Sequence, residues 1–92
     1  MTDKTQSIRT VSEFFYSVPK VLGHYGIPEP RLESEIMLSE IIGVNTHFLY
    51  ANGTFPLTED MQRDLIRILQ RRIKREPLAY ILEHREFYSA DF

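Results

Sequence analysis

Residues 27–45 read IPEPRLESEIMLSEIIGVN, and this stretch predicts the helix around which the rest of the chain packs. Pro28 and Pro30 favour a helix start, where a missing backbone N–H costs little, and Gly43 favours a helix end. The apolar residues spread around most of the predicted helix: Leu32, Ile36, Met37, Leu38, Ile41 and Ile42. A helix that is apolar nearly all round is a buried one, so we expect the central helix of a bundle.

This central helix leaves one polar gap, which holds Glu33 and Glu40, one heptad apart. Two helical turns separate the two carboxylates by roughly 10 Å along the axis. A narrow acidic strip facing solvent is therefore a better interpretation than a pair of catalytic carboxylates.

Another helix is predicted ahead of the central one, ending at Gly26. Thr10 is a helix-capping residue, and Glu13 three positions later completes a capping box. Pro19 lies inside the helical pattern and removes a backbone hydrogen bond, so we expect either a kink or two short helices. The apolar residues keep to one face on both sides of this proline, which favours the kink: Val11, Phe14, Phe15, Val18, Val21, Leu22 and Tyr25.

Two further helices follow the central one. Asn45 is expected to cap one or two helical turns, and Thr58 is expected to cap a longer helix over residues 59–75. In the longer helix, acidic residues stand in the first turn and basic residues in the last, as the helix dipole prefers. Its inward stripe is Met61, Leu65, Ile68, Leu69 and Ile73.

The end of the chain changes character. Pro77 opens a short helix through about Leu82, and the alternating, aromatic-rich residues beyond it favour extended structure. The predicted fold is all-α: a small bundle of about four to five helices, followed by a short extended C-terminal segment. Residues 1–9 are expected to be a flexible tail, residues 10–83 the helical domain, and residues 84–92 the extended segment.

Composition excludes several classes of protein. The chain has 92 residues, 42% of them hydrophobic and 26% charged, as in an ordinary soluble domain. Its net charge of −2 gives no overall attraction to nucleic acid or anionic membranes. There is no cysteine, no apolar run long enough to span a membrane and no signal peptide, so we expect a cytoplasmic protein without a membrane partner.

No active site is evident in the sequence. His24, His47 and His84 lie on three different segments, and none has a second ligand at a spacing typical of metal sites. The four glycines stand alone, so there is no glycine-rich phosphate loop. We therefore predict no catalytic, cofactor-binding or metal-binding residue in these 92 residues.

A basic stripe is the one candidate for a binding surface. Arg63, Arg67, Arg71 and Lys74 follow the spacing i, i+4, i+8, i+11, which places them on one face of the predicted helix. The stripe is either an ordinary solvated helix surface or a docking face for an acidic protein or nucleic acid. Nucleic acid is the less favoured partner, because the rest of the domain is acidic and no aromatic residues interleave the stripe.

Two motifs resemble those of a known family. Pro30, Arg31, Leu32 and Glu35 match one helical motif of the N-terminal domain of HemK/PrmC-type release-factor glutamine methyltransferases. A second and more specific motif matches in the RR…EP-AYIL…REFY segment: Arg71, Arg72, Glu76, Pro77, Ala79, Tyr80, Ile81, Leu82, Arg85, Glu86, Phe87 and Tyr88. The resemblance runs from about Val11 to Phe92.

The resemblance implies a two-domain enzyme. Its helical domain would help to hold a peptide-chain release factor. A second domain, absent from this sequence, would transfer the methyl group of S-adenosylmethionine to the glutamine of a Gly-Gly-Gln loop. These 92 residues alone are then expected to be inactive, to bind no cofactor, and to pack against their own C-terminal methyltransferase domain through residues 84–92.

Two departures from the family pattern carry structural expectations. Glycine is usual in the family where this chain has Glu83, so the last helix is expected to run on toward Arg85. Glycine is also common where this chain has Arg75. The alternative to the family function is a stand-alone helical interaction module that uses its basic face on an acidic protein or nucleic acid.

Overall fold

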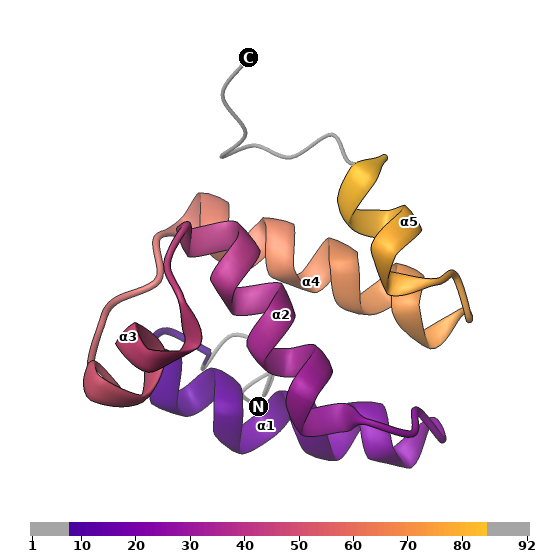
Figure 1. Ribbon diagram of the computed structural model, residues 1–92, viewed down its shortest axis with the longest axis horizontal. Coiled ribbons are helices and arrows are strands. Elements are labelled where there is room, and N and C mark those ends of the chain that lie inside the picture. Colours follow the sequence, from indigo (N-terminus) through magenta and orange to yellow (C-terminus); the bar gives the residue numbers. More distant parts are fainter. Residues whose placement is uncertain (1–7, 85–92) are drawn as a thin grey trace, which may run out of the picture.

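The computed structural model describes residues 8–84, and within that range the chain forms five helices and no strand (Figure 1). They are α1 (Val11–His24), α2 (Pro30–Ile42), α3 (Thr46–Ala51), α4 (Glu59–Ile73) and α5 (Leu78–Glu83). The predicted all-α fold is confirmed. Of the predicted extended segment, the structure describes only His84, which is the C-cap residue of α5; the rest of the segment lies outside the described residues.

Helix α2 is the central element. It contacts α1, α3 and α4, while α5 packs against α4, and Figure 1 shows α2 running between α1 and α4. The expectation that α2 is buried all round is wrong, because Leu32 and Ile36 are 49% and 37% exposed. The prediction of a solvent-facing acidic strip is wrong at Glu33, whose side chain is only 15% exposed and forms an ion pair with Arg72 of α4.

The core joins all five helices. Each contributes at least one side chain that is no more than 2% exposed, and the largest of these are Phe14, Leu22, Met37, Leu38, Leu49, Ile68 and Ile81. The short helices α3 and α5 are too short to be stable alone in water. They are therefore held by the apolar side chains that they insert into the shared core.

Side-chain caps set three helix starts, as the sequence predicted. The side chains of Thr10, Asn45 and Thr58 each accept the backbone N–H of the third residue that follows, at 3.2, 2.9 and 3.1 Å. At the end of α2, Gly43 has φ +84° and donates its N–H to the Ser39 carbonyl. A side chain is disfavoured in that left-handed conformation, which accounts for glycine there.

The start of α1 is also held by the loop that joins α3 to α4. Backbone N–H groups of Val11 and Ser12 donate to the carbonyls of Phe55 (3.1 Å) and Gly53 (2.9 Å), so two donors that a helix start leaves unpaired are satisfied. The sequence placed residues 8 and 9 in the tail. In the structure Ile8 is buried, and the carbonyl of residue 9 accepts the N–H of Leu57 at 2.8 Å.

Pro19 does not divide α1. The helix runs without a break from Val11 to His24 with Pro19 inside it, so two separate short helices are excluded. The proline still removes one backbone donor and crowds the turn before it.

We expect Pro19→Ala to raise the free energy of unfolding by about 1–2 kcal/mol, to be measured by urea denaturation. Restoring a helical donor is worth up to ~3 kcal/mol, and the greater freedom of the unfolded alanine chain offsets ~0.4–1 kcal/mol of it. Lys20→Ala is the matched control at the exposed neighbouring position and should change stability by less than ~0.5 kcal/mol. A lower urea midpoint for Pro19→Ala than for the unaltered chain would contradict this interpretation.

Candidate partner-binding surface

Three of the four residues of the predicted basic stripe lie around one hollow. Arg67, Arg71 and Lys74 line a shallow depression of about 680 Å³ on the outer side of α4. The remaining lining residues are Gln70, Glu76, Glu83 and His84, which bring the end of α5 to the same place. Arg63 is not part of this hollow, so the stripe is not one continuous surface of equivalent cations.

Arg63 belongs to the first turns of α4. Its guanidinium lies 2.9 Å from a carboxylate oxygen of Asp60 and 3.6 Å from one of Glu59, and its side chain is 52% exposed. Such exposed pairs within a helix contribute little to stability, but they do reduce the charge that Arg63 presents to a partner.

Arg71 connects α4 to the residues that precede and follow α5. Its Nε and Nη2 donate to Glu76 Oε1 at 2.9 and 2.7 Å, and its Nη1 donates to the His84 carbonyl at 2.8 Å. The hydrogen bonds to Glu76 raise the pKa of the Arg71 guanidinium above its ordinary value, so it stays charged. Arg71 therefore fastens the α4–α5 turn and the end of α5 to α4.

Arg67 and Lys74 are the available cations of the hollow. Both are exposed, and in the part of the chain that the structure describes neither forms an ion pair. They stand one on each side of Arg71 along α4, separated by about two turns, or roughly 10 Å. Two unpaired cations beside a fixed Arg71–Glu76 pair can receive carboxylates of a partner.

Arg72 is a residue whose role the sequence interpretation missed. Its Nε and Nη2 donate to Oε1 and Oε2 of Glu33 at 2.7 and 3.2 Å, and its Nη1 donates to the Glu76 carbonyl at 3.1 Å. Both paired side chains are 15% exposed. The hydrogen bond to Glu33 raises the pKa of Arg72 above its ordinary value. This ion pair joins α2 to α4.

A periodicity signal could have placed Arg72 inside. It follows Leu65 by seven residues and Ile68 by four, so it continues the inward stripe of α4 and not the basic one. An arginine at that position needs a carboxylate partner on the neighbouring helix, and Glu33 supplies it.

Arg75 occupies the position where the family pattern favours glycine. Its φ is +78°, a left-handed conformation that side chains adopt rarely, and its Nη2 donates to the Tyr25 carbonyl at 2.7 Å. The other expectation from the family pattern is wrong, because α5 ends at Glu83 and does not continue toward Arg85.

The groups that this surface presents are mainly charged side chains. Within residues 8–84, no group of three metal-ligating side chains is present. None of the described helices is both long enough and apolar enough to cross a membrane. Arg67 and Lys74 offer charge and hydrogen-bond donors, and the carboxylates that face the hollow belong to Glu76 and Glu83.

By fold and surface, the described residues form a small all-α domain that offers paired and unpaired cations on one helix. The sequence matches the PrmC N-terminal domain over residues 18–82. The chain therefore belongs to the family of PrmC N-terminal domains.

Curated relatives support this membership. The chain is 36% identical over 92 residues to a release factor glutamine methyltransferase of Geobacter sulfurreducens, covering 100% of this chain and 32% of that protein. It is 42% identical over 60 residues to the Salmonella typhimurium protein of the same name, covering 65% of this chain and 22% of that one. A bifunctional methyltransferase of Rickettsia bellii is 38% identical over 84 residues, covering 84% and 15% of the two chains. No solved structure matches significantly.

The chain thus spans about a third or less of the length of these relatives. Both the family and the all-α fold implied by the sequence motifs are confirmed.

Proposed function

We propose that this chain is the release-factor-binding domain of a protein-(glutamine-N5) methyltransferase, which methylates the Gly-Gly-Gln glutamine of a peptide-chain release factor. The observation that carries the proposal is the match of all 92 residues of this chain to about a third of a relative named release factor glutamine methyltransferase. Its setting is the cytoplasm, where release factors act. The methyl donor, S-adenosylmethionine, and the catalytic groups belong to the rest of the whole protein.

In this proposal, the domain binds the substrate and the rest of the protein transfers the methyl group. The relatives are about three times as long or longer, so most of a methyltransferase lies outside the matched region. Within the described residues, the candidate surface holds charged groups suited to docking a protein. A domain of this kind contributes affinity and orientation for the substrate, which lowers the barrier by positioning the reacting groups.

The docking surface in this proposal is the basic face of α4. Arg67 and Lys74 make the direct contacts, Arg71 holds the hollow in shape, and Arg63 extends the positive face toward the start of the helix. Charge complementarity of this type steers a partner and fixes its orientation more than it adds raw affinity. The preferred contact on the release factor is therefore an acidic patch outside its Gly-Gly-Gln loop.

Nucleic acid fits this face less well. Arg63 and Arg71 are engaged with carboxylates, Arg72 is turned toward α2, and Arg75 binds a backbone carbonyl. Tight binding to nucleic acid needs several cations that can neutralise phosphates. Since most arginines near this face already bind other groups of the protein, it offers few such cations.

Reversing both available charges, with Arg67→Glu and Lys74→Glu together, should weaken binding of a purified release factor about tenfold or more. Isothermal titration calorimetry with the 92-residue chain measures it. A control adds two negative charges elsewhere, with His24→Glu and His47→Glu, which is half of the net-charge change made by the double reversal, and should bind within about twofold of the unaltered chain.

Unchanged affinity in the α4 double variant would reduce the face to an ordinary solvated helix surface. Binding of a single-stranded oligonucleotide that is tighter than binding of the release factor, and that falls steeply with salt, would favour the stand-alone module instead.

A further inference from the structure

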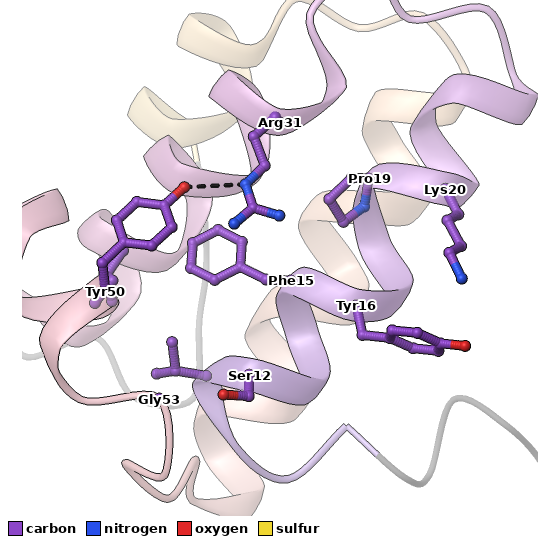
Figure 2. A pocket seen from close by; sticks show the side chains of 10 residues that line it. Ser12, Phe15, Tyr16, Pro19, Lys20, Arg31, Tyr50 and Gly53 are labelled. Carbon is purple, nitrogen blue, oxygen red and sulfur yellow. Dashed lines mark hydrogen bonds between the residues drawn. The ribbon is translucent and has the colours of Figure 1, made fainter.

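A second hollow lies on the other side of the domain, among α1, α2 and α3, and encloses about 520 Å³ (Figure 2). We call it the aromatic groove and define it by Phe15, Tyr16, Pro19, Lys20, Arg31 and Tyr50. None of these residues belongs to α4 or α5. The groove is therefore separate from the surface proposed to dock the release factor.

Arg31 is held in a fixed position at one wall of the groove. Its guanidinium carbon lies 4.4 Å from the ring centroid of Phe15 and 5.3 Å from that of Tyr50. The two rings are stacked on each other, with centroids 5.2 Å apart and planes within 6°. Cation–π contacts with two rings restrict the guanidinium far more than a solvated arginine is restricted.

The Tyr50 hydroxyl completes this arrangement. It accepts a hydrogen bond from Arg31 Nε at 3.0 Å and donates one to the carboxylate of Glu35 (Figure 2 shows the Arg31 bond). The Tyr50 hydroxyl thus bonds both the Nε–H of Arg31 and the carboxylate of Glu35. The two terminal nitrogens of the guanidinium are left to form a two-pronged hydrogen bond with a carboxylate, the geometry in which arginine binds best.

Lys20 supplies a second cation to the groove. Its Nζ lies 3.7 Å from the ring centroid of Tyr16, and both side chains are exposed. Among residues 8–84, no ion pair joins Lys20 or Arg31 to a carboxylate. The groove therefore has two cations over aromatic rings, Arg31 and Lys20. Pro19 adds an apolar side chain to its lining.

We propose that the aromatic groove binds a peptide segment of a partner protein that carries carboxylate side chains. The carboxylates complement Arg31 and Lys20, and apolar or proline residues between them pack on Pro19 and the ring edges. Aromatic-lined grooves suit extended, proline-containing segments, which lose little entropy on binding. The proposal does not require that partner to be a release factor.

The ring contacts argue for a peptide over nucleic acid. Base stacking needs open ring faces, whereas Phe15 is only 8% exposed and is covered by Arg31 and Tyr50, and Lys20 occupies one face of the exposed Tyr16 ring. Two cations also neutralise few phosphates, and the chain as a whole has a net charge of −2.

The test uses acetyl-Pro-Glu-Pro-Glu-Pro-amide as the probe, titrated into the isotope-labelled 92-residue chain and followed by nuclear magnetic resonance. We expect binding with a Kd of about 1 mM, with shift changes at Tyr16, Lys20, the Arg31 Nε–H and Tyr50. The matched peptide with glutamine in place of glutamate should bind about tenfold more weakly, because the charged hydrogen bonds are lost.

Arg31→Gln and Lys20→Gln should each weaken binding of the glutamate peptide, by about tenfold and about threefold respectively. Within residues 8–84, the contact that Lys20 would lose is the one with Tyr16, so Lys20→Gln keeps the fold intact and remains informative if Arg31→Gln is destabilised. Arg67→Gln on α4 is the matched control and should leave peptide binding unchanged.

Three results of the peptide titration would overturn the proposal. They are no shift changes at 5 mM peptide, about five times the expected Kd, equal binding of the glutamine peptide, and shift changes that follow α4 in place of the groove. Tighter binding of a single-stranded oligonucleotide at the same residues would also overturn it. The result is independent of release-factor binding, since Arg67→Glu with Lys74→Glu tests that separately.

Discussion

Replacing Arg72 with methionine is expected to lower the free energy of unfolding by about 2–3 kcal/mol. The guanidinium makes two hydrogen bonds to Glu33 and one to the Glu76 carbonyl, and both side chains of the ion pair are only 15% exposed. Removing Arg72 leaves a largely buried carboxylate on α2 without its partner. A completely buried carboxylate without its partner would cost more. Because the Glu33 side chain keeps some exposure to solvent, the expected loss is limited to about 2–3 kcal/mol.

The double variant Arg72→Met with Glu33→Leu separates the loss of the ion pair from the cost of leaving the Glu33 carboxylate buried without a partner. Because it removes both charges and keeps apolar volume, it should recover much of the stability lost by Arg72→Met alone. Arg63→Met is the matched control, since Arg63 also pairs with carboxylates but is 52% exposed, and should cost less than about 0.5 kcal/mol. Urea denaturation followed by circular dichroism measures all three. Equal costs for Arg72→Met and Arg63→Met would show that the α2–α4 pair does not hold the helices together.

The elements that the sequence predicted well depend on neighbours in the chain. The caps at Thr10, Asn45 and Thr58, and the glycine at the end of α2, act within three or four residues, so local chemistry determines them. The family motif added Arg75 as a position that favours glycine, and the backbone there has a positive φ. Local signals therefore gave most helix ends to within one or two residues.

Most of the predictions that failed depend on contacts between distant residues. Glu33 and Arg72 are 39 residues apart, and although the periodicity of α4 can place Arg72 inside, neither helix alone identifies the partner of its charged residue. The bond from Arg71 to the His84 carbonyl requires α5 to fold back on α4. For the basic stripe, periodicity predicts the shared helix face but does not show which of the cations already pair with other groups of the protein.

The aromatic groove shows the same limit at another place. Arg31 and Glu35 belong to the first family motif, but their connection through Tyr50 needs α3 to lie beside α2. No periodicity within either segment indicates that three such side chains meet. The all-α fold follows from local patterns, whereas both candidate surfaces follow from packing.

Truncating Ile81 to alanine should have the other large effect, a loss of about 3 kcal/mol in the stability of α5 docking. Ile81 is completely buried, whereas the helix that carries it has only six residues and cannot hold its shape without tertiary contacts. Leu78 and Leu82 are partly buried beside the same core, so Ile81 is the main apolar anchor of α5.

Hydrogen exchange distinguishes a local loss from a global one. The Ile81 N–H donates to the Pro77 carbonyl at 3.0 Å and the His84 N–H to the Tyr80 carbonyl at 2.9 Å, so both report whether α5 is formed. In Ile81→Ala these amides should lose protection by about a hundredfold, while amides of α1 and α2 lose less. The matched control is Tyr80→Ala, on the exposed side of α5, which should change their protection by less than about tenfold.

The position of α5 gives this loss a functional consequence. Glu83 and His84 form one side of the hollow that contains Arg67 and Lys74, and Arg71 fixes that side through the His84 carbonyl. If α5 detaches, the hollow loses that side while the cations of α4 remain in place, so the release-factor binding that we propose for this hollow should weaken without any change in charge. Ile81→Ala with normal α5 protection but weakened binding would contradict this account, because the residue would then act other than by holding α5 against α4.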